Sequence, residues 1–494
     1  MRKKLLYLNT ISSLSYEVVA LICGFILPKA ILLYFGSEVN GLVSSITQFL
    51  SFITLMDLGV GAVLKSTLYK PLANNDNKKI SEILTSGQKF FSRVAFLFVI
   101  YTGVLIFIYP LFVDDFGYWY TALLIAAIAL NTFAQYYFGM VNKLLLDADQ
   151  KTYIPTVIRS LAYIINTASC IVLIVMGAGI QMVKLNTSLV FLLQPLLIGL
   201  YVRKNYAVSK HVKLTEEPIK QKWNGLAQHI ASYVLGATDT VVLTLLSTLE
   251  NVSIYSVYIM IIGAVKTFTM ALTNGTQALL GNMLAREEKQ LLESTFSAYE
   301  TIIHFVSTFA FGCTAILIAP FISVYTKEIN DANYYAPVFG GVLAFAYMSY
   351  CYRLPYNTMV LAAGHYKQTQ KSAWIEMTIN IVISVLTVIK FGLVGVAVGT
   401  LTAMLYRSSY LAWYLSHNII KRPLKYFIKH MMVNCISLTA VIFATYQFGL
   451  TELTYGAWLV LALKVALISL VVCLIFNGIF YRKDFIKIKS MIIR

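Results

Sequence analysis

Three cationic side chains lie deep inside long apolar segments of this 494-residue chain, where a charged group is costly. At 1.5 Å per residue, Lys266, Arg353 and Arg407 are about 20 Å from the outer ends of their segments, which is too far for their charges to reach that surface easily. A guanidinium group can donate two parallel hydrogen bonds to phosphate oxygens, and an ammonium group adds a point charge. These residue types therefore predict an anion-binding site, and a phosphate group suits it best.

The same cations have a second interpretation, as helix-packing residues neutralised by carboxylates of the protein. Asp239 and Glu376 are the available partners, although Glu376 is expected near the inner surface, where its side chain can snorkel. Three cations against two carboxylates leave positive charge unbalanced, and an aqueous cavity that receives an anion explains the excess. Both interpretations remain open at this point.

Other charged residues of the apolar segments are candidates for binding or for ion coupling. Arg159 is near the inner end of its segment and is a weaker candidate for anion binding. Asp57 should also lie near the inner surface, either bound to a local partner such as Lys65 or able to exchange a cation. Together with Glu17 and Asp239, it forms the set of carboxylates that we consider for coupling to Na⁺ or H⁺.

The elements that must position these residues are apolar segments long enough to cross a bilayer, since ~30 Å of hydrocarbon requires about 20 helical residues. The composition agrees, with 58% hydrophobic and 12% charged residues and a mean hydropathy of +0.72. The sequence predicts an all-α polytopic membrane protein with fourteen transmembrane helices. The predicted spans are 6–33, 39–64, 90–110, 119–142, 154–176, 180–201, 226–248, 252–275, 297–320, 336–362, 372–391, 392–416, 428–449 and 455–480.

Lysine and arginine are concentrated in every second gap between these spans, and the intervening gaps hold only Lys184, Lys327 and Lys390. By the positive-inside rule, both termini are cytoplasmic and the number of spans is even. The net charge of +17 reflects this bias, so no nucleic-acid partner is expected. The first span is expected to be an uncleaved helix, because it is too long for a signal peptide and has no small-residue cleavage site.

Several kinds of chemistry are not indicated by the sequence. All six cysteines lie inside spans without CxxC or Cys/His spacing, which argues against disulfides and metal sites. There is no Walker loop, and no Ser/His/Asp or paired-carboxylate arrangement stands out in the short gaps. We therefore expect no enzyme activity, no catalytic residues, no metal and no cofactor. His304, alone in its span, is more simply a packing residue.

Segments separated by about 215 residues resemble each other. NKLLLDAD at 142–149 resembles NTMVLAAG at 357–364, and Gly59 and Gly177 recur as Gly275 and Gly392. This pattern predicts a duplication with a six-helix bundle at 1–222, a second at 223–420, and two additional helices with a cytoplasmic tail at 421–494. Because six spans restore the starting side, the bundles should be related by a pseudo-two-fold axis along the membrane normal. Such repeats commonly bind substrate between their halves.

Four short sequences carry a resemblance to a known family. They are NTISSLSYEVV near the start, SEVNGLVSSITQFLSFITLMDLGVGAVL, NKLLLDADQKTY with its echo NTMVLAAGHYKQ, and KFGLVGVAVGT. On these, the chain resembles the bacterial polysaccharide (O-antigen or capsule repeat-unit) flippases of the multidrug/oligosaccharidyl-lipid/polysaccharide exporter superfamily. The resemblance covers the first twelve spans and extends to the last two.

The resemblance implies a transporter of the bacterial plasma (inner) membrane. Its cargo would be an undecaprenyl-diphosphate-linked oligosaccharide, moved from the inner to the outer leaflet by alternating access for cell-surface polysaccharide synthesis. Other polysaccharide assembly proteins and membrane lipids would be its partners. By likeness, the diphosphate would bind Lys266, Arg353 and Arg407, with Arg159 weaker, while tyrosines such as Tyr350 could stack on sugar rings.

Two other transport functions remain open. A cation-coupled multidrug exporter of the same superfamily should have a cavity dominated by carboxylates, whereas this chain has surplus cations in mid-span. A peptidoglycan-precursor or teichoic-type flippase would share the diphosphate chemistry. The membrane potential and exchange of a cation such as Na⁺ or H⁺ are rival sources of energy, and the sequence does not choose between them.

Overall fold

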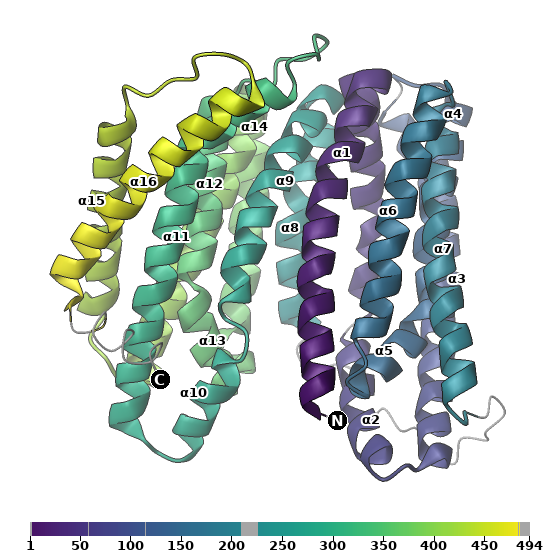
Figure 1. Cartoon of the computed structure of the whole chain (residues 1–494), viewed down its shortest axis with the longest axis horizontal. Coiled ribbons are helices and arrows are strands. Elements are labelled where there is room, and N and C mark those ends of the chain that lie inside the picture. The colour runs from purple at the N-terminus through teal and green to yellow at the C-terminus, as the bar shows by residue number, and fades with distance from the viewer. Residues whose placement is uncertain (1, 58, 114, 209–225, 483, 485–494) are drawn as a thin grey trace. The chain divides into compact units, whose positions relative to one another are not determined.

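The computed structural model describes residues 2–57, 59–113, 115–208, 226–482 and 484, and these residues form helices and connecting turns with no strand. They divide into two compact units, Met1–Ile230 and Ala231–Arg494. Each unit is a set of long helices packed side by side (Figure 1). The predicted all-α class is confirmed.

In the first unit, the longest helix packs on α6, while α7 packs on both α4 and α6. Gly36 adopts a φ of 83° within that longest helix, so the chain turns there and two helices are joined end to end. Only glycine adopts this backbone conformation readily. The elements are α1 (Arg2–Ser51), η1 (Phe52–Asp57), α2 (Val60–Ala73), α3 (Asn77–Ile108), η2 (Tyr109–Leu111), α4 (Tyr118–Ala134), the π-helical turn η3 (Gln135–Gly139), α5 (Met140–Ala148), α6 (Tyr153–Val175) and α7 (Ile180–Asn205).

In the second unit, α12 packs between α11 and α14, and α16 lies across α11 and α15 (Figure 1). Leu317 of α11 and Val465 of α16 share a buried apolar contact, which ties the last helices of the chain to this unit. The elements are α8 (Leu226–Leu246), α9 (Leu249–Ala271), α10 (Thr276–Ala285), α11 (Lys289–Tyr325), α12 (Pro337–Tyr352), α13 (Leu354–Ala362), α14 (Tyr366–Asn418), α15 (Lys425–Thr445) and α16 (Tyr455–Phe480).

The 53-residue helix α14 is a helical hairpin, because Gly392 takes a φ of 52° and reverses the chain. Hydrogen bonds join its two halves. The Asn380 amide donates to the Thr400 hydroxyl at 2.9 Å, and the Thr387 hydroxyl donates to the Gly395 carbonyl at 2.8 Å. A Cβ atom at Gly395 would collide with the Thr387 carbonyl group. Small residues thus let the two halves approach closely, as in other membrane helix pairs.

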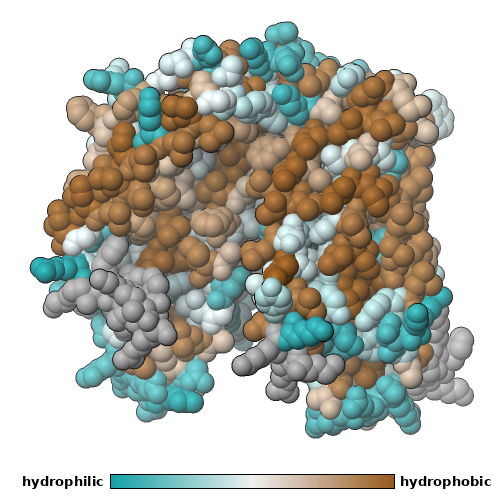
Figure 2. Space-filling view, viewed as in Figure 1, coloured by the Kyte–Doolittle hydropathy of each residue, from teal (hydrophilic) through white to brown (hydrophobic). Residues whose placement is uncertain are grey.

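Ten of the described helices are long and apolar enough to cross a membrane. Large apolar side chains such as Phe443 and Leu111 are 86% and 78% exposed, and Figure 2 shows brown apolar surface bounded by teal polar ends. The chain is therefore a multi-pass membrane protein. The count of fourteen spans stays a prediction. Helices α1 and α14 each run through two predicted spans, and α12, at 16 residues, is shorter than a full crossing.

The predicted duplication has counterparts in the backbone. Gly59 and Gly275 both adopt left-handed conformations, with φ of 73° and 82°, immediately before the short helices α2 and α10. Helix α2 packs on α5 in the first unit, and α10 packs on α13 in the second. These equivalent features support the duplication, while the domain limits at 222 and 420 stay predictions.

Candidate functional site

Arg353 occupies the break between α12 and α13. Pro355 follows two positions later in the first turn of α13, and since proline has no backbone N–H to donate to the Cys351 carbonyl group, it helps to end α12 here. Arg353 is only 9% exposed, and its guanidinium group donates a hydrogen bond to the Glu376 carboxylate. The centre of that guanidinium group also lies 4.2 Å from the centre of the Tyr350 ring. The break thus points a cation into the packed interior of the second unit.

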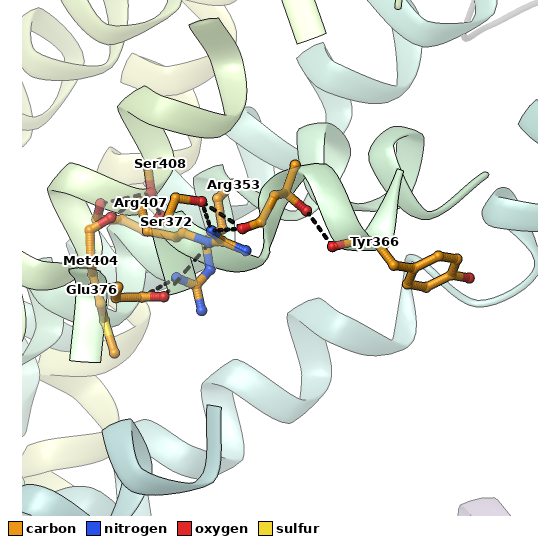
Figure 3. Close-up of polar contacts among 9 residues, drawn as sticks. Arg353, Tyr366, Ser372, Glu376, Met404, Arg407 and Ser408 are labelled. Atoms are coloured by element: carbon orange, nitrogen blue, oxygen red, sulfur yellow. Dashed lines mark hydrogen bonds and ion pairs between the residues drawn. The ribbon is translucent and has the colours of Figure 1, made fainter. Parts of the chain in front are cut away.

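Arg407 reaches the same carboxylate from the opposite half of the α14 hairpin. Its Nε atom lies 3.7 Å from Oε2 of Glu376, and Nη1 donates to the Thr369 carbonyl oxygen at 2.9 Å and to the Ser372 hydroxyl. Figure 3 shows Arg353 and Arg407 turned toward Glu376. Two buried guanidinium groups therefore share one carboxylate.

Lys266, on α9, is half-buried at the edge of this cluster. Its Nζ atom lies 4.4 Å from the Tyr350 ring centre and 5.3 Å from that of Tyr347. No carboxylate among the described residues pairs with it. The Tyr350 ring therefore contacts both Lys266 and Arg353, an arrangement in which the ring quadrupole attracts each cation. We call Lys266, Arg353, Arg407, Glu376 and Tyr350 the cation cluster.

The second interpretation, in which Asp239 neutralises one of these cations, is wrong for this carboxylate. Asp239 is 2% exposed, and it accepts a hydrogen bond from the Tyr255 hydroxyl at 3.0 Å. The Thr400 hydroxyl lies 2.8 Å from both of its carboxylate oxygens. Within the described part of the chain, only neutral donors surround it. Among the described residues, the cation cluster consequently has three cations and one carboxylate, Glu376, and carries two formal positive charges in excess.

The expectation that Glu376 snorkels to the inner surface is also wrong. Helix α14 begins at Tyr366, so Glu376 lies ten residues, or ~15 Å, from the helix start, and its side chain is buried. The interpretation that Glu376 neutralises cations to hold helices together is therefore correct for part of the charge. It does not account for the two positive charges that the cation cluster has in excess.

The remaining predicted site residues belong to the first unit. The Arg159 guanidinium group lies 4.9 Å from the ring centre of Tyr16 and 5.8 Å from that of Tyr163, so within the first unit it stacks on aromatic faces. Glu17 is exposed on α1. Asp57 ends η1, and its side chain lies outside the described residues.

A second buried ionic group was missed at the level of sequence. Glu300, which is fully buried on α11, accepts hydrogen bonds from the Arg422 guanidinium group and, at 2.7 Å, from the Tyr356 hydroxyl. The Nε2 atom of His430 lies 3.4 Å from the same carboxylate. His304 stacks on Tyr352 and bonds to neighbouring polar groups, as expected of a packing residue. The one available signal was the four-residue spacing of Glu300 and His304, which places both on one helix face.

No protein-family model matches the sequence, and no curated protein matches it. Solved structures do. The chain is similar to "Lipid II flippase MurJ, inward closed conformation", with a TM-score of 0.70 and 16% identity over 97% of this chain and 99% of that one. It is also similar to an inward-facing multidrug resistance MATE family transporter of the MOP superfamily, with a TM-score of 0.60 and 14% identity over 83% and 99%. It is similar as well to an outward-facing MATE family transporter, with a TM-score of 0.53 and 14% identity over 85% of this chain and 97% of that one. The likeness establishes the fold, which this chain shares with these structures.

Proposed function

We propose that this protein is a flippase for an anionic, lipid-linked oligosaccharide. The substrate would be an undecaprenyl-diphosphate-linked repeat unit carried from the inner to the outer leaflet of the bacterial plasma membrane for cell-surface polysaccharide synthesis. The observation that carries the proposal is the cation cluster, in which two buried arginines share one carboxylate and a half-buried lysine lies beside the Tyr350 ring.

The charge of the cluster suits a diphosphate. A diphosphate diester carries about two negative charges, and the cluster has two positive charges in excess of Glu376. Each guanidinium group has five N–H donors in a planar fork, so Arg353 and Arg407 can bind phosphate oxygens while each keeps a contact with Glu376. Lys266 adds a point charge beside them. Such a site replaces the water that an anion loses when it enters the membrane.

Transport requires that this binding differs between two conformations of the protein, because a ligand shifts an equilibrium only by its differential affinity. Glu376 supplies a way to vary that affinity: when it draws both arginines onto itself, fewer N–H groups remain for phosphate. With the cell interior negative, release of the anion outward is favoured by ~2.3 kcal/mol per charge per 100 mV.

Two alternatives draw on specific observations. The likeness to MurJ extends over 97% of the chain, which favours a flippase and leaves a peptidoglycan or teichoic-type precursor as a rival cargo. Asp239, buried among hydroxyl donors, is the feature that favours a cation-coupled multidrug exporter like the MATE transporters, since oxygen donors around a carboxylate can hold Na⁺ or a proton. Asp57 and Glu17 stay further candidates for such coupling.

The test is leaflet exchange in liposomes that contain the purified protein and a fluorescent lipid-linked oligosaccharide, with drug efflux measured in parallel. Arg353→Ala and Arg407→Ala should each abolish exchange while the protein still inserts. Arg286→Ala, which removes an exposed arginine of the same unit, is the matched control and should exchange normally. Full exchange by both cluster variants, or drug efflux without exchange, would contradict the proposal.

A further inference from the structure

The first unit contains a cavity of about 950 Å³ that the proposed transport chemistry does not use. It opens between α3, α7 and the segment formed by η3 and α5. This volume is at the upper end of the range for small-molecule sites, ~300–1,000 Å³. All of its lining residues belong to the first unit.

The local backbone explains why the cavity is open. The π-helical turn Gln135–Gly139 displaces a backbone carbonyl group, and the Gln88 amide from α3 donates to that of Tyr137 at 2.7 Å. Close by, Gly139 meets α7 tightly, since a Cβ atom there would lie 2.9 Å from Cβ of Pro195. One turn further along α7, Gly199 has only the Asn142 amide nitrogen near its Cβ position, at 3.5 Å. The absent side chain of Gly199 therefore leaves space in the cavity wall.

The charges of the lining are all of one sign. Lys89, Arg93 and Arg203 line the cavity, and no Asp or Glu does. Lys89 and Arg93 are four residues apart, so they extend from consecutive turns of one face of α3. Arg203 lies in the last turn of α7. All three side chains are exposed, and among the described residues none forms an ion pair.

The remainder of the lining is apolar and continues into the membrane-facing surface. Leu84, Val141, Leu196 and Leu200 contribute the apolar wall, and the next turn of α3 presents Phe96, which is 67% exposed. The cations therefore lie where the apolar belt gives way to the basic, inner end of the helices. Basic pockets at this depth between membrane helices bind anionic lipid head groups.

One edge of the cavity is fixed by a small polar group outside the membrane-spanning helices. The Tyr206 hydroxyl donates to Asp149, and Lys151 pairs with the same carboxylate at 2.7 Å. Burial opposes the charged form of Lys151, but hydrogen bonds with Asp149 and Tyr206 outweigh it and raise the pKa of the ammonium group above its ordinary value. Because Lys151 remains charged, the nearby Asp149 is neutralised and does not cancel the positive potential of the cavity.

We infer that this cavity binds one anionic phospholipid of the inner leaflet, with its phosphate among Lys89, Arg93 and Arg203 and its acyl chains along the leucine wall. The combination of unpaired cations and a long apolar wall matches an amphiphile rather than a soluble anion. The site is separate from the cation cluster, and the inference does not depend on the proposed cargo.

The test is native mass spectrometry of the whole chain in detergent, with phosphatidylglycerol, phosphatidylcholine of the same chains, or glycerol phosphate added. One phosphatidylglycerol should be retained, and neither of the other two compounds. Lys89→Gln/Arg93→Gln/Arg203→Gln should raise the dissociation constant about tenfold or more. The matched control, Lys70→Gln/Lys78→Gln/Lys204→Gln, removes three exposed cations of the same unit outside the cavity and should bind normally.

Gly199→Leu provides a test that leaves every charge in place. Its side chain would fill the cavity where only Asn142 lies near, so phosphatidylglycerol should no longer be retained. This variant carries the test if the triple variant fails to fold. Equal retention of phosphatidylcholine, unchanged binding by the Gly199 variant, or displacement of phosphatidylglycerol by undecaprenyl diphosphate at lower concentration would overturn the inference. The last outcome would assign the cavity to a lipid diphosphate instead.

Discussion

The second unit holds two buried sites in which arginine meets glutamate, and they differ in how completely the charges are matched. At Glu300, one arginine, one histidine and a tyrosine hydroxyl converge on one carboxylate. In the cation cluster, two arginines pair with Glu376, and Lys266 adds a third positive charge beside the Tyr350 ring. A closed, balanced group holds helices together, whereas a group with surplus charge still has the capacity to bind an anion. Burial of an ion pair by itself does not tell these two roles apart.

The largest effect that separates the two sites is on stability. Glu300→Gln leaves Arg422 buried without a countercharge and should lower the free energy of unfolding by about 3–5 kcal/mol. Glu293→Gln, an exposed substitution on the same helix, is the control and should have little effect. Denaturant titration of the purified protein in detergent measures both. An unchanged midpoint for Glu300→Gln would mean that this group does not hold α11 and α15 together.

Substituting one arginine together with the glutamate at each site should show which of the two sites takes part in transport. Arg353→Gln/Glu376→Gln leaves the net charge of the cation cluster unchanged but removes one guanidinium fork. Since a charge-assisted hydrogen bond contributes about 1.5–3 kcal/mol, leaflet exchange should fall by at least tenfold. Arg422→Gln/Glu300→Gln is the same pair of substitutions at the balanced site, and it should leave leaflet exchange by the folded fraction of the protein unchanged. Equal losses at the two sites would erase the distinction between them.

Lys266 tests whether surplus charge contributes to binding. It has no carboxylate partner among the described residues, so Lys266→Gln should barely change stability. The substrate dissociation constant should rise about fivefold, as expected for ~1 kcal/mol from a half-buried charge. The difference should shrink as salt screens the charge. Titration at two salt concentrations measures this effect, and a dissociation constant equal to that of the unaltered protein would exclude Lys266 from the site.

For the cation cluster, the sequence predicted the cationic residues better than it predicted their partners. The predicted spans 372–391 and 392–416 meet at Gly392, where the hairpin turn of α14 lies, and the search for cations in apolar segments pointed to Lys266, Arg353 and Arg407. The hydrogen-bond and ion-pair partners of buried charges were harder to predict, because they depend on how each helix is rotated about its axis and on the residue at which it begins. Asp239 meets Thr400 across 161 residues, and Glu300 meets Arg422 across 122, separations at which residue spacing carries no information.

The same reasoning explains the error over Glu376. A span predicted to begin at residue 372 puts this carboxylate near the surface, whereas α14 begins one and a half turns earlier, at Tyr366. A small error in a helix boundary thus placed near a helix end a charge that is buried inside the second unit. The register of the α14 hairpin then brought Ser372 opposite Arg407, a pairing that only the turn at Gly392 determines.

The smallest expected effect concerns Tyr350, the ring that Lys266 and Arg353 share. Tyr350→Leu removes the aromatic face and should weaken substrate binding about two- to fivefold, since a cation–π contact of a partly exposed side chain contributes about 0.5–1 kcal/mol. Tyr350→Phe keeps the ring and should bind normally, which separates the ring from the hydroxyl group. Lys289, an exposed cation in the first turn of α11, provides the control, and Lys289→Gln measures the loss of a cation elsewhere in the same unit. If the leucine and phenylalanine variants bind equally well, the ring does not orient the cations, and their arrangement depends on Glu376 alone.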